Sequence, residues 1–531
     1  MNSLERMASR SQTPVSWSQL EALALAAAGG LAIVWCIASL WFPFGWDQGI
    51  MAAVGDQIVR GGMPYRDGWD MKGPLAFYLF AAVQWIFGRH MWPIRILDVL
   101  LLLVAAGVLG RMVARITSPR TGLWVAVALV LWHGSLSWFF LSQPDGWVAV
   151  LMVMAVAPLA VQSDKADFRA LVWCGLLIGC CGLIKPFYAA FGLVPVVFAL
   201  SSRESYSRRI LGMLAAGIAA IVPVLAALAW FIKRGALNSL IEVHFSYARA
   251  YSGWLGPEVF ARRIYNYFWS NGVPTPAGAV AVVLPAIGFG GYILLRQQRR
   301  LGLVLLTWLG VALFCVAIQG KFWVYHWTPT FPPFAALAGI GLWNLSRSAS
   351  SGIASGLPLA VFSALLFFGQ VAASPTVDVG RWLQFMTGMK TRTQYYSQYV
   401  RRFYVASDTM EASAYLKERT SPSDTIAVWG NEATINYLSE RQNPTRFVFA
   451  MPLTAVGSAI LRANYRKEYM AAFNTHPPRY FVVGQPHDGS PDKAAVLREF
   501  PELDSFVRDH YSLERQFGFL DLYRLAETRP E

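Results

Sequence analysis

Long apolar stretches with few charged residues make up most of the first 375 positions of the chain. A helix of about 20 apolar residues is long enough to cross the hydrocarbon core of a bilayer. On this length criterion, the pattern predicts eleven membrane-spanning helices, at about residues 20–42, 92–113, 121–140, 146–162, 170–184, 187–201, 210–232, 276–295, 301–319, 328–346 and 352–373. The predicted fold class is therefore a polytopic α-helical membrane protein.

Residues 43–91, between the first two spans, follow a different pattern. Gln48–Arg60 and Leu75–Phe87 each repeat apolar residues at helical spacing, and glycines follow both segments. Short amphipathic helices of this kind lie along a membrane surface rather than across it. The segment between them, Pro64–Pro74, contains turn-forming residues. The sequence therefore predicts two surface helices joined by an extended, turn-rich strip in the first outer loop.

Charge density rises after residue 374, and short β-like runs alternate with helical ones. Thr425–Trp429 and Tyr480–Val483 are predicted strands, and Ser512–Phe517 and Phe519–Leu525 form a predicted terminal hairpin. Such alternation favours an α/β domain with a mainly parallel sheet. We therefore divide the chain into a membrane domain, residues 1–374, and a soluble outer α/β domain, residues 375–531. No glycine-rich phosphate motif opens a predicted helix of this domain, so a structural or docking role is favoured over nucleotide binding.

The composition agrees with a membrane protein and excludes an ordinary soluble enzyme. Of 531 residues, 55% are hydrophobic and 14% are charged, and the mean hydropathy is +0.40. The five cysteines, at positions 36, 174, 180, 181 and 315, all lie within predicted spans. Small buried side chains explain these cysteines better than a disulfide framework or a zinc site.

The distribution of Lys and Arg predicts the orientation, because short cytoplasmic loops carry an excess of positive charge. With a cytoplasmic amino terminus, the cations on that side are Arg6, Arg10, Arg111, Arg115, Arg120, Lys165, Arg169, Arg203, Arg208, Arg209, Arg296, Arg299, Arg300 and Arg347. An odd number of spans then places residues 375–531 outside the cytoplasmic (inner) membrane. The net charge of +14 also includes cations in long outer segments, where an anionic substrate is the natural explanation. Nothing in the sequence indicates nucleic acid binding.

Ionisable residues cluster in the first outer loop, at Asp47, Arg66, Asp67, Asp70 and Lys72. Charged groups at a membrane boundary are costly unless they meet water, a partner or a substrate. Asp47 is either the N-cap of the following helix or a base that accepts a proton from a hydroxyl. Asp67 precedes Gly68, and this pair is common in turns, so a role in a turn is the structural alternative for Asp67. Lys72 either extends to the interface or meets a phosphate at the membrane surface.

The order of these elements resembles the membrane-embedded glycosyltransferases of the GT-C superfamily, near the protein-mannosyltransferase-like and lipid A aminoarabinose-transferase-like members of glycosyltransferase family 39. Those enzymes show an acidic residue just after the first span and a Lys-Pro-Pro-Leu-like element that opens a second surface helix. Asp47 and the run Lys72-Gly73-Pro74-Leu75 stand in these places. Two later segments resemble the family as well. The span Gly175–Lys185, followed by Pro186, resembles a span of these enzymes that ends in Lys-Pro or Lys-Gly, and Lys321–Pro329 resembles the outer loop that many bacterial members place late in the membrane part. The resemblance covers about residues 20–375.

Two positions depart from the family pattern. Gln48 stands where many members carry a second acid, and Gly73 replaces the first proline of Lys-Pro-Pro. Both departures point away from the protein-mannosyltransferase subgroup and from a metal-dependent mechanism. No cofactor is expected to be required, and no metal ligands are assigned; a divalent cation is compatible with the sequence but not indicated by it.

The resemblance implies transfer of one sugar from a polyprenyl-phosphate donor to a lipid, polysaccharide or protein acceptor, with inversion, on the outer face of the membrane. It makes Asp47 the catalytic base, because an acceptor hydroxyl needs one, and Lys72 the first candidate to stabilise the leaving phosphate. Weaker candidates for the phosphate are Arg66, Lys185, Lys321 and His326. Candidate contacts for the sugar or the acceptor are Tyr65, Asp67, Trp69, Asp70, Asp145, Glu242 and His244.

Several of these residues also have structural explanations. Asp145 begins a predicted helix and suits its cap. Around Glu242 and His244, an interfacial aromatic belt predicts the same composition as a sugar-stacking surface. The competing functions are a transporter or flippase for a lipid-linked sugar and a non-catalytic scaffold. No convincing internal repeat supports a transporter, and the polar residues cluster at the outer boundary rather than at mid-membrane.

Overall fold

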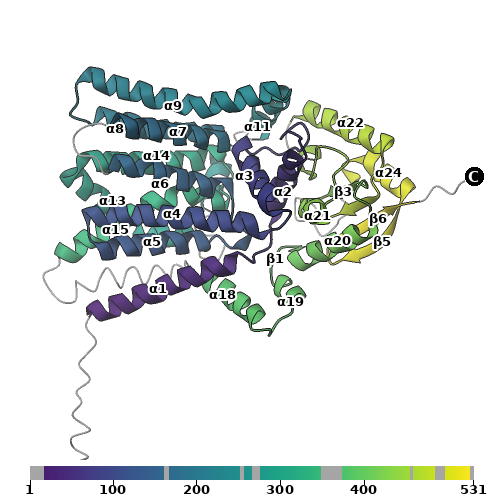
Figure 1. Ribbon diagram of the computed structural model, residues 1–531, viewed down its shortest axis with the longest axis horizontal. Helices are drawn as coiled ribbons and strands as arrows, with labels where there is room; N and C mark the ends of the chain where they lie inside the picture. Colours follow the sequence, from purple (N-terminus) through teal and green to yellow (C-terminus); the bar gives the residue numbers. More distant parts are fainter. Residues whose placement is uncertain are drawn as a thin grey trace, which may run out of the picture.

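The computed structural model describes residues 17–160, 167–251, 256–265, 276–348, 373–454, 458–484 and 497–526. A bundle of long helices carries a smaller α/β domain at one end (Figure 1). Two short helices, α2 (Trp46–Val59) and α3 (Pro74–Phe87), lie between the bundle and that domain (Figure 1).

The main helices of the bundle run side by side (Figure 1). They are α1 (Trp17–Ser39), α4 (Trp92–Ile116), α5 (Pro119–Gly134), α6 (Pro144–Ala160), α7 (Phe168–Ile184), α8 (Leu193–Leu200), α9 (Tyr206–Lys233), α13 (Pro276–Gln297), α14 (Arg299–Gln319) and α15 (Phe331–Ser348). Shorter elements join them, namely η1 (Trp138–Phe140), η2 (Pro186–Gly192), α10 (Leu237–Ile241), the π-helical η3 (Glu242–Tyr247), α11 (Ala248–Tyr251), α12 (Pro257–Tyr265) and η5 (Val324–Thr330).

Among the described residues, four helices are long and apolar enough to cross a membrane: α1 from Glu21, α4, α9 and α14. Helices α6 and α7 have 17 residues each, at the short end of the range that spans a bilayer. The predicted polytopic helical fold class is confirmed. The predicted span at 121–140 is too long, because α5 ends at Gly134 and Ser137 takes a φ of 67° before η1. The predicted span at 352–373 lies almost wholly outside the described residues.

The two helices predicted between the first two spans are present as α2 and α3. Pro74 is the first residue of α3, where the missing N–H of proline costs no helical hydrogen bond. Gly88 ends this helix with a φ of 78°, a conformation that glycine adopts without strain. The strip between the two helices turns tightly, and Tyr65 N donates to Gly68 O at 2.7 Å.

The α/β domain contains a four-stranded mixed sheet in the order β3-β4-β6-β5. β3 (Ile426–Trp429) pairs in parallel with β4 (Tyr480–Val483), whereas β6 (Leu520–Leu525) pairs antiparallel with both β4 and β5 (Tyr511–Phe517). The prediction of a mainly parallel sheet is therefore wrong. The terminal hairpin turns at Gly518, with a φ of 50°, and returns beside β4 in the opposite direction.

Helices cover both faces of this sheet. On one face, α20 (Ala406–Arg419) and α21 (Thr434–Ser439) pack on alternate residues of β3 and β4. On the other face, α22 (Ala459–Thr475) places Phe473 at 6.0 Å from Phe481 of β4, and α24 (Pro501–His510) packs against Phe473. β3 and β4 are buried at every residue, which explains why they read as continuous apolar runs.

The α/β domain packs directly on residues 43–91, the segment between α1 and α4. Trp69 of this segment is fully buried, its backbone N–H donates to Arg446 O at 2.7 Å, and its ring lies 5.7 Å from the ring of Phe449. Gly49 of α2 faces Thr434 of α21 so closely that a Cβ there would overlap the threonine side chain. A single cluster of buried apolar residues extends from the bundle into the domain.

A connecting segment joins the bundle to the sheet. It contains α18 (Ala373–Met386), α19 (Arg392–Tyr396) and a two-stranded antiparallel hairpin of β1 (Val400–Arg401) and β2 (Tyr404–Val405). α18 packs beside the end of α1, where the rings of Trp382 and Trp41 lie 5.9 Å apart.

The first testable prediction concerns orientation. Helix α1 begins at the end of the bundle opposite to the α/β domain (Figure 1), and the predicted cytoplasmic amino terminus therefore places this domain outside. A reporter enzyme that folds only outside the cytoplasm is expected to be active when it is fused after Glu531. Activity only with a cytoplasmic reporter would show that the number of spans is even.

Candidate active site

Lys72 lies between two carboxylates at the end of the bundle that faces the α/β domain. Its Nζ is 2.9 Å from Asp47 Oδ1 and 3.1 Å from Asp70 Oδ2. Gln143 donates from Nε2 to the other oxygen of Asp47, at 3.2 Å. The side chains of Lys72 and Asp70 are 10% and 2% exposed, whereas that of Asp47 is 28% exposed. Asp47 is therefore the member of this cluster most accessible to a substrate.

The charges of this cluster set its protonation. Burial opposes ionisation of Asp47, but the Lys72 ammonium, with Lys185 and Gln143, outweighs burial and holds the pKa of Asp47 below its usual value. Burial raises the pKa of Asp70; Lys72 offsets part of that rise, and the charge of Asp47 adds to it. Burial also disfavours charge on Lys72, yet the two carboxylates raise its pKa above the usual value. At neutral pH, Lys72 is therefore a cation and Asp47 an anion.

A second ion pair joins Lys185 to Asp145. Lys185 Nζ lies 2.9 and 2.8 Å from the two carboxylate oxygens of Asp145 and 2.8 Å from Gln319 Oε1. The Tyr188 hydroxyl donates to Asp145 as well. Asp145 is completely buried in the first turn of α6, so its carboxylate serves this ion pair rather than the helix cap that the sequence suggests.

His326 lies in the field of three lysines. Its ring is buried, and burial, together with the charges of Lys185, Lys321 and Lys72, lowers its pKa well below the usual value. The imidazole is therefore neutral, and its Nδ1 has no hydrogen-bond partner within the described part of the chain. The Lys321 ammonium lies 4.4 Å from the ring centre of Tyr251. Cations that converge beside an imidazole N–H provide a setting in which an anion is stabilised.

A backbone hydrogen bond holds the two lysine-bearing segments together. Gly73, directly after Lys72, donates its N–H to the carbonyl oxygen of Ile184 at 2.9 Å, directly before Lys185. A Cβ at Gly73 would lie 2.7 Å from the carbonyl carbon of Ile184 and would overlap the carbonyl oxygens of Leu183 and Ile184. Proline has no N–H to donate and carries a Cβ. The close approach therefore explains why glycine replaces the family's proline here.

Gln48, rather than Asp47, organises the start of α2. Gly45 is the N-cap residue, and its N–H donates to Gln48 Oε1 at 2.9 Å. Gln48 Nε2 donates to the carbonyl oxygens of Phe139, at 3.1 Å, and Leu141. The interpretation of Asp47 as an N-cap is therefore wrong, because Asp47 already lies inside the first turn. Its carboxylate is left to interact with Lys72 and Gln143.

Arg66 and Asp67 pair with each other on the exposed side of the strip. Arg66 Nη2 lies 2.7 Å from Asp67 Oδ2, and its Nη1 donates to the carbonyl oxygen of Arg234 at 2.8 Å. Asp67 Oδ2 also accepts the N–H of Met63 at 2.6 Å. These contacts agree with the turn explanation for Asp67, and they engage the guanidinium of Arg66 away from Lys72.

Tyr65 holds the backbone of Lys72 in place. Its ring is fully buried, and its hydroxyl donates to the carbonyl oxygen of Lys72 at 2.8 Å. His244 Nε2 lies 3.0 Å from the same hydroxyl, and burial lowers the pKa of His244 to about 4. Tyr65 takes a φ of 71°, which is uncommon for a residue other than glycine and gives the strip its sharp turn. Tyr65 and the neutral His244 therefore form part of the scaffold of the site.

Trp69 and Glu242 connect the strip and η3 to the α/β domain. Glu242 Oε1 accepts from Tyr465 OH at 2.6 Å and from Arg446 Nη2 at 3.1 Å. Arg446 also donates to Tyr65 O, at 3.1 Å, and to both oxygens of Glu468. The ring of Trp69 lies 4.6 Å from that of Tyr247. Trp69 and Glu242, which the sequence predicts to contact the sugar or the acceptor, thus contact other residues of the protein.

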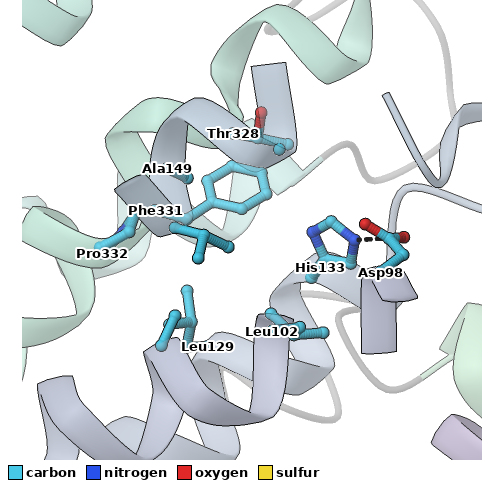
Figure 2. Close-up of a pocket in the computed structure, with 11 residues that line it drawn as sticks. Asp98, Leu102, Leu129, His133, Ala149, Thr328, Phe331 and Pro332 are labelled. Atoms are coloured by element: carbon cyan, nitrogen blue, oxygen red, sulfur yellow. Dashed lines mark ion pairs between the residues drawn. The ribbon is translucent and has the colours of Figure 1, made fainter. Parts of the chain in front are cut away.

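A buried polar group on α4 holds the loop that carries Gln143. Asp98 accepts from Ser142 N and Oγ, at 2.9 and 3.1 Å, and Arg95 donates to Ser142 Oγ and Pro43 O, at 3.0 and 2.6 Å. Figure 2 shows the His133 ring turned toward Asp98, with Leu129 and Phe331 across a small cavity. His133 Nε2 lies 3.6 Å from Asp98 Oδ2. This group fixes both the entry to α2 and the loop before α6.

Among the described residues, no group of three or more His, Cys, Asp and Glu side chains is arranged as a metal site. Tyr188, Gln319 and Gln143 were not predicted from the sequence as part of the site. Gln319 ends a predicted span and Gln143 precedes Pro144, so a polar residue at an outer span end was the only available signal.

Comparison with known proteins identifies the fold. Residues 71–230 match the model of the family described as dolichyl-phosphate-mannose-protein mannosyltransferase. ArnT from Cupriavidus metallidurans bound to undecaprenyl phosphate is similar over 94% of this chain and 97% of its own, with a TM-score of 0.58 and 16% identity. The chain has the fold of the GT-C superfamily. The resemblance inferred from Asp47 and the Lys72 run is confirmed.

Two further solved structures extend the comparison. ArnT from the same organism in the apo state covers the same shares of both chains, with a TM-score of 0.56 and 16% identity. An oligosaccharyltransferase from Archaeoglobus fulgidus, tethered to an acceptor peptide with the NVT sequon, is similar over 94% of this chain and 74% of its own, with a TM-score of 0.50 and 12% identity. No protein of curated function matches the sequence.

The second prediction tests the close approach of Gly73 to α7. Gly73→Ala forces a Cβ against two carbonyl groups, and overpacking of this kind costs about 1–3 kcal/mol of unfolding free energy. We expect a lower melting temperature of the purified protein in detergent. Gly107→Ala in α4 is the matched control, because no atom lies within 4 Å of a Cβ there. Equal melting temperatures for the two variants would contradict the tight approach.

Proposed function

We propose that the protein is an inverting glycosyltransferase that moves one sugar from a polyprenyl-phosphate donor to an acceptor at the outer face of the cytoplasmic membrane. The observation that carries the proposal is the Lys72 ammonium shared by a partly exposed and a buried carboxylate at one end of an apolar bundle. A carboxylate beside fixed cations suits a reaction in which a hydroxyl loses a proton and a phosphate gains charge. The undecaprenyl phosphate of the similar ArnT structure supports a lipid-phosphate donor.

The proposed reaction assigns one role to each ion. Asp47 accepts the proton of the acceptor hydroxyl while that oxygen bonds to the anomeric carbon of the sugar. The bond from this carbon to the phosphate oxygen breaks on the opposite face, and its electron pair stays on the phosphate, so the configuration inverts. Lys72 neutralises the charge that develops there, and Lys185, Lys321 and His326 add to the field.

No cofactor or metal ion takes part in this proposal. The Lys72 ammonium lies between Asp47 and Asp70, in the position where a divalent cation would otherwise bridge two carboxylates. The acceptor is a lipid, a polysaccharide or a protein. Arg66 and Asp67 are left outside the mechanism because they pair with each other.

Lys72 has to change partner during the reaction. While its ammonium is bonded to Asp47, that carboxylate is a weak base, because its pKa is held down. The donor phosphate competes with Asp47 for the ammonium, whereas the deeply buried Asp70 keeps its bond. Donor binding therefore releases Asp47 before the acceptor hydroxyl has to be deprotonated.

The third prediction concerns Asp47. Asp47→Asn keeps the shape of the side chain and an oxygen for Gln143, and Lys72 retains Asp70 as its counterion. A missing general base lowers the rate by roughly 10²–10⁴-fold. We therefore expect transfer from a synthetic polyprenyl-phosphate sugar to fall at least about 10²-fold, with little change in melting temperature.

Asp67→Asn is the matched control for Asp47→Asn, because it removes a carboxylate from the same loop but outside the Lys72 cluster. We expect this control to retain transfer within a few-fold of the wild type. Near-normal transfer by Asp47→Asn would remove Asp47 from the mechanism and direct attention to Asp70.

The fourth prediction concerns the order of substrate binding. If the donor phosphate has to displace Asp47 from Lys72, an acceptor analogue without the attacking hydroxyl binds only after the donor. Initial-rate measurements are expected to show uncompetitive inhibition by this analogue against the donor and competitive inhibition against the acceptor. A mixed or noncompetitive pattern against the donor would mean that the acceptor site is complete without the donor.

A further inference from the structure

We propose that residues 377–402, here called the basic segment, bind the headgroups of anionic phospholipids in the outer leaflet. The segment contains Arg381, Lys390, Arg392, Arg401 and Arg402, and no Asp or Glu occurs between Asp378 and Asp408. Of these cations, only Arg381 pairs with a carboxylate of the described residues, Asp378, at 3.5 Å. The segment therefore presents a positive charge that the protein itself leaves largely uncompensated.

The same segment exposes large apolar side chains. Val377, Leu383 and Met386 of α18 are 52%, 45% and 51% exposed, and Met389 just beyond the helix is 69% exposed. Leu383 and Met386 are three residues apart and therefore share one face of the helix, and Met389 follows at the same spacing just beyond it. Apolar residues beside cations on a short helix are the pattern of a segment that lies in the interface of a bilayer.

The location of α18 agrees with this membrane level. α18 packs beside the end of α1, and Trp382 contacts Trp41, two residues past the end of that helix. Helix α1 is long and apolar enough to span a membrane, and it exposes Ile33 and Ile37 at 62% and 43%. The basic segment thus begins where a membrane-spanning helix ends, which is the depth of the lipid headgroups.

The charge selects the kind of lipid. The charged groups of Lys390, Arg392 and Arg402 have no ion-pair partner in the described part of the chain. A zwitterionic headgroup has no net negative charge that could compensate them. An anionic headgroup does, and each Lys or Arg near a membrane surface changes the local preference for anionic lipid roughly fivefold. Arg401 is held in place over the ring of Phe140, 4.4 Å from its centre. The occupant of this surface is therefore an anionic phospholipid rather than a bulk zwitterionic one.

The fifth prediction uses an environment-sensitive fluorophore on Met389→Cys in the full-length protein, reconstituted in vesicles of phosphatidylcholine and phosphatidylglycerol. Four of the native cysteines are buried and one, Cys180, is half-buried, so labelled wild type gives the background. We expect blue-shifted emission, and stronger quenching by spin-labelled phosphatidylglycerol than by spin-labelled phosphatidylcholine. Lys390→Gln with Arg392→Gln is expected to reduce this preference at least about fivefold.

Ile460→Cys is the matched control, because Ile460 is a comparably exposed apolar residue, 76% exposed, on α22 of the α/β domain. Its fluorophore is expected to report water and to be quenched by neither lipid. A fluorophore at position 389 that also reports water would overturn the proposal. Equal quenching by the two spin-labelled lipids would overturn it as well, since it would show apolar contact without recognition of charge.

Discussion

The ammonium of Lys72, shared by Asp47 and Asp70, is the interaction on which the outer end of the bundle depends. Loss of one partner of a buried ion pair costs about 3–5 kcal/mol, because the other charge is left uncompensated. The backbone around Lys72 is accordingly fixed, by the hydrogen bond from Tyr65 to the carbonyl oxygen of Lys72 and by that from Gly73 to Ile184. Carboxylates of the protein already pair with Lys72 and Lys185 before any substrate arrives. In the proposed reaction, a phosphate therefore binds by exchanging partners with a carboxylate rather than by filling an uncompensated positive pocket.

The α/β domain packs on the strip that carries Lys72. Arg446 joins the two parts, because its guanidinium donates hydrogen bonds to Tyr65 of the strip Pro64–Pro74, Glu242 of η3 and Glu468 of α22. Its carbonyl oxygen also accepts the N–H of Trp69. Three segments that are far apart in the sequence thus contact the same side chain. The strip that carries Lys72 is held between bundle and domain, which explains why a short loop can keep a buried ammonium in place.

Much of the architecture could be predicted because it depends on local patterns. The length of the apolar stretches predicted most helices of the bundle. The helical spacing of apolar residues, with the glycines that follow, predicted α2 and α3, and Gly518 marked the turn of the terminal hairpin. The mixed sheet could not be predicted, because strand order depends on long-range pairing that a single sequence does not encode locally. In the site, Asp47 and Lys72 stood out as charges at a membrane boundary. Their pairing with Asp70 and the contacts of Gln143 arise from tertiary packing, and Trp69 and Glu242 proved to have partners in a domain that follows hundreds of residues later.

The two departures from the family pattern have a common physical basis. Gln48 and Gly73 both donate hydrogen bonds to backbone carbonyl oxygens, Gln48 to Phe139 and Leu141, and Gly73 to Ile184. An ionised acid at position 48 offers no donor and would face two carbonyl oxygens in a fully buried place, whereas a proline at 73 lacks the N–H. Each departure therefore fastens a segment that carries a charged site residue, Asp47 or Lys72, to a neighbouring loop or helix. With both segments fixed in this way, an ammonium bridges the carboxylates, and a second acid beside Asp47 would only add an uncompensated charge.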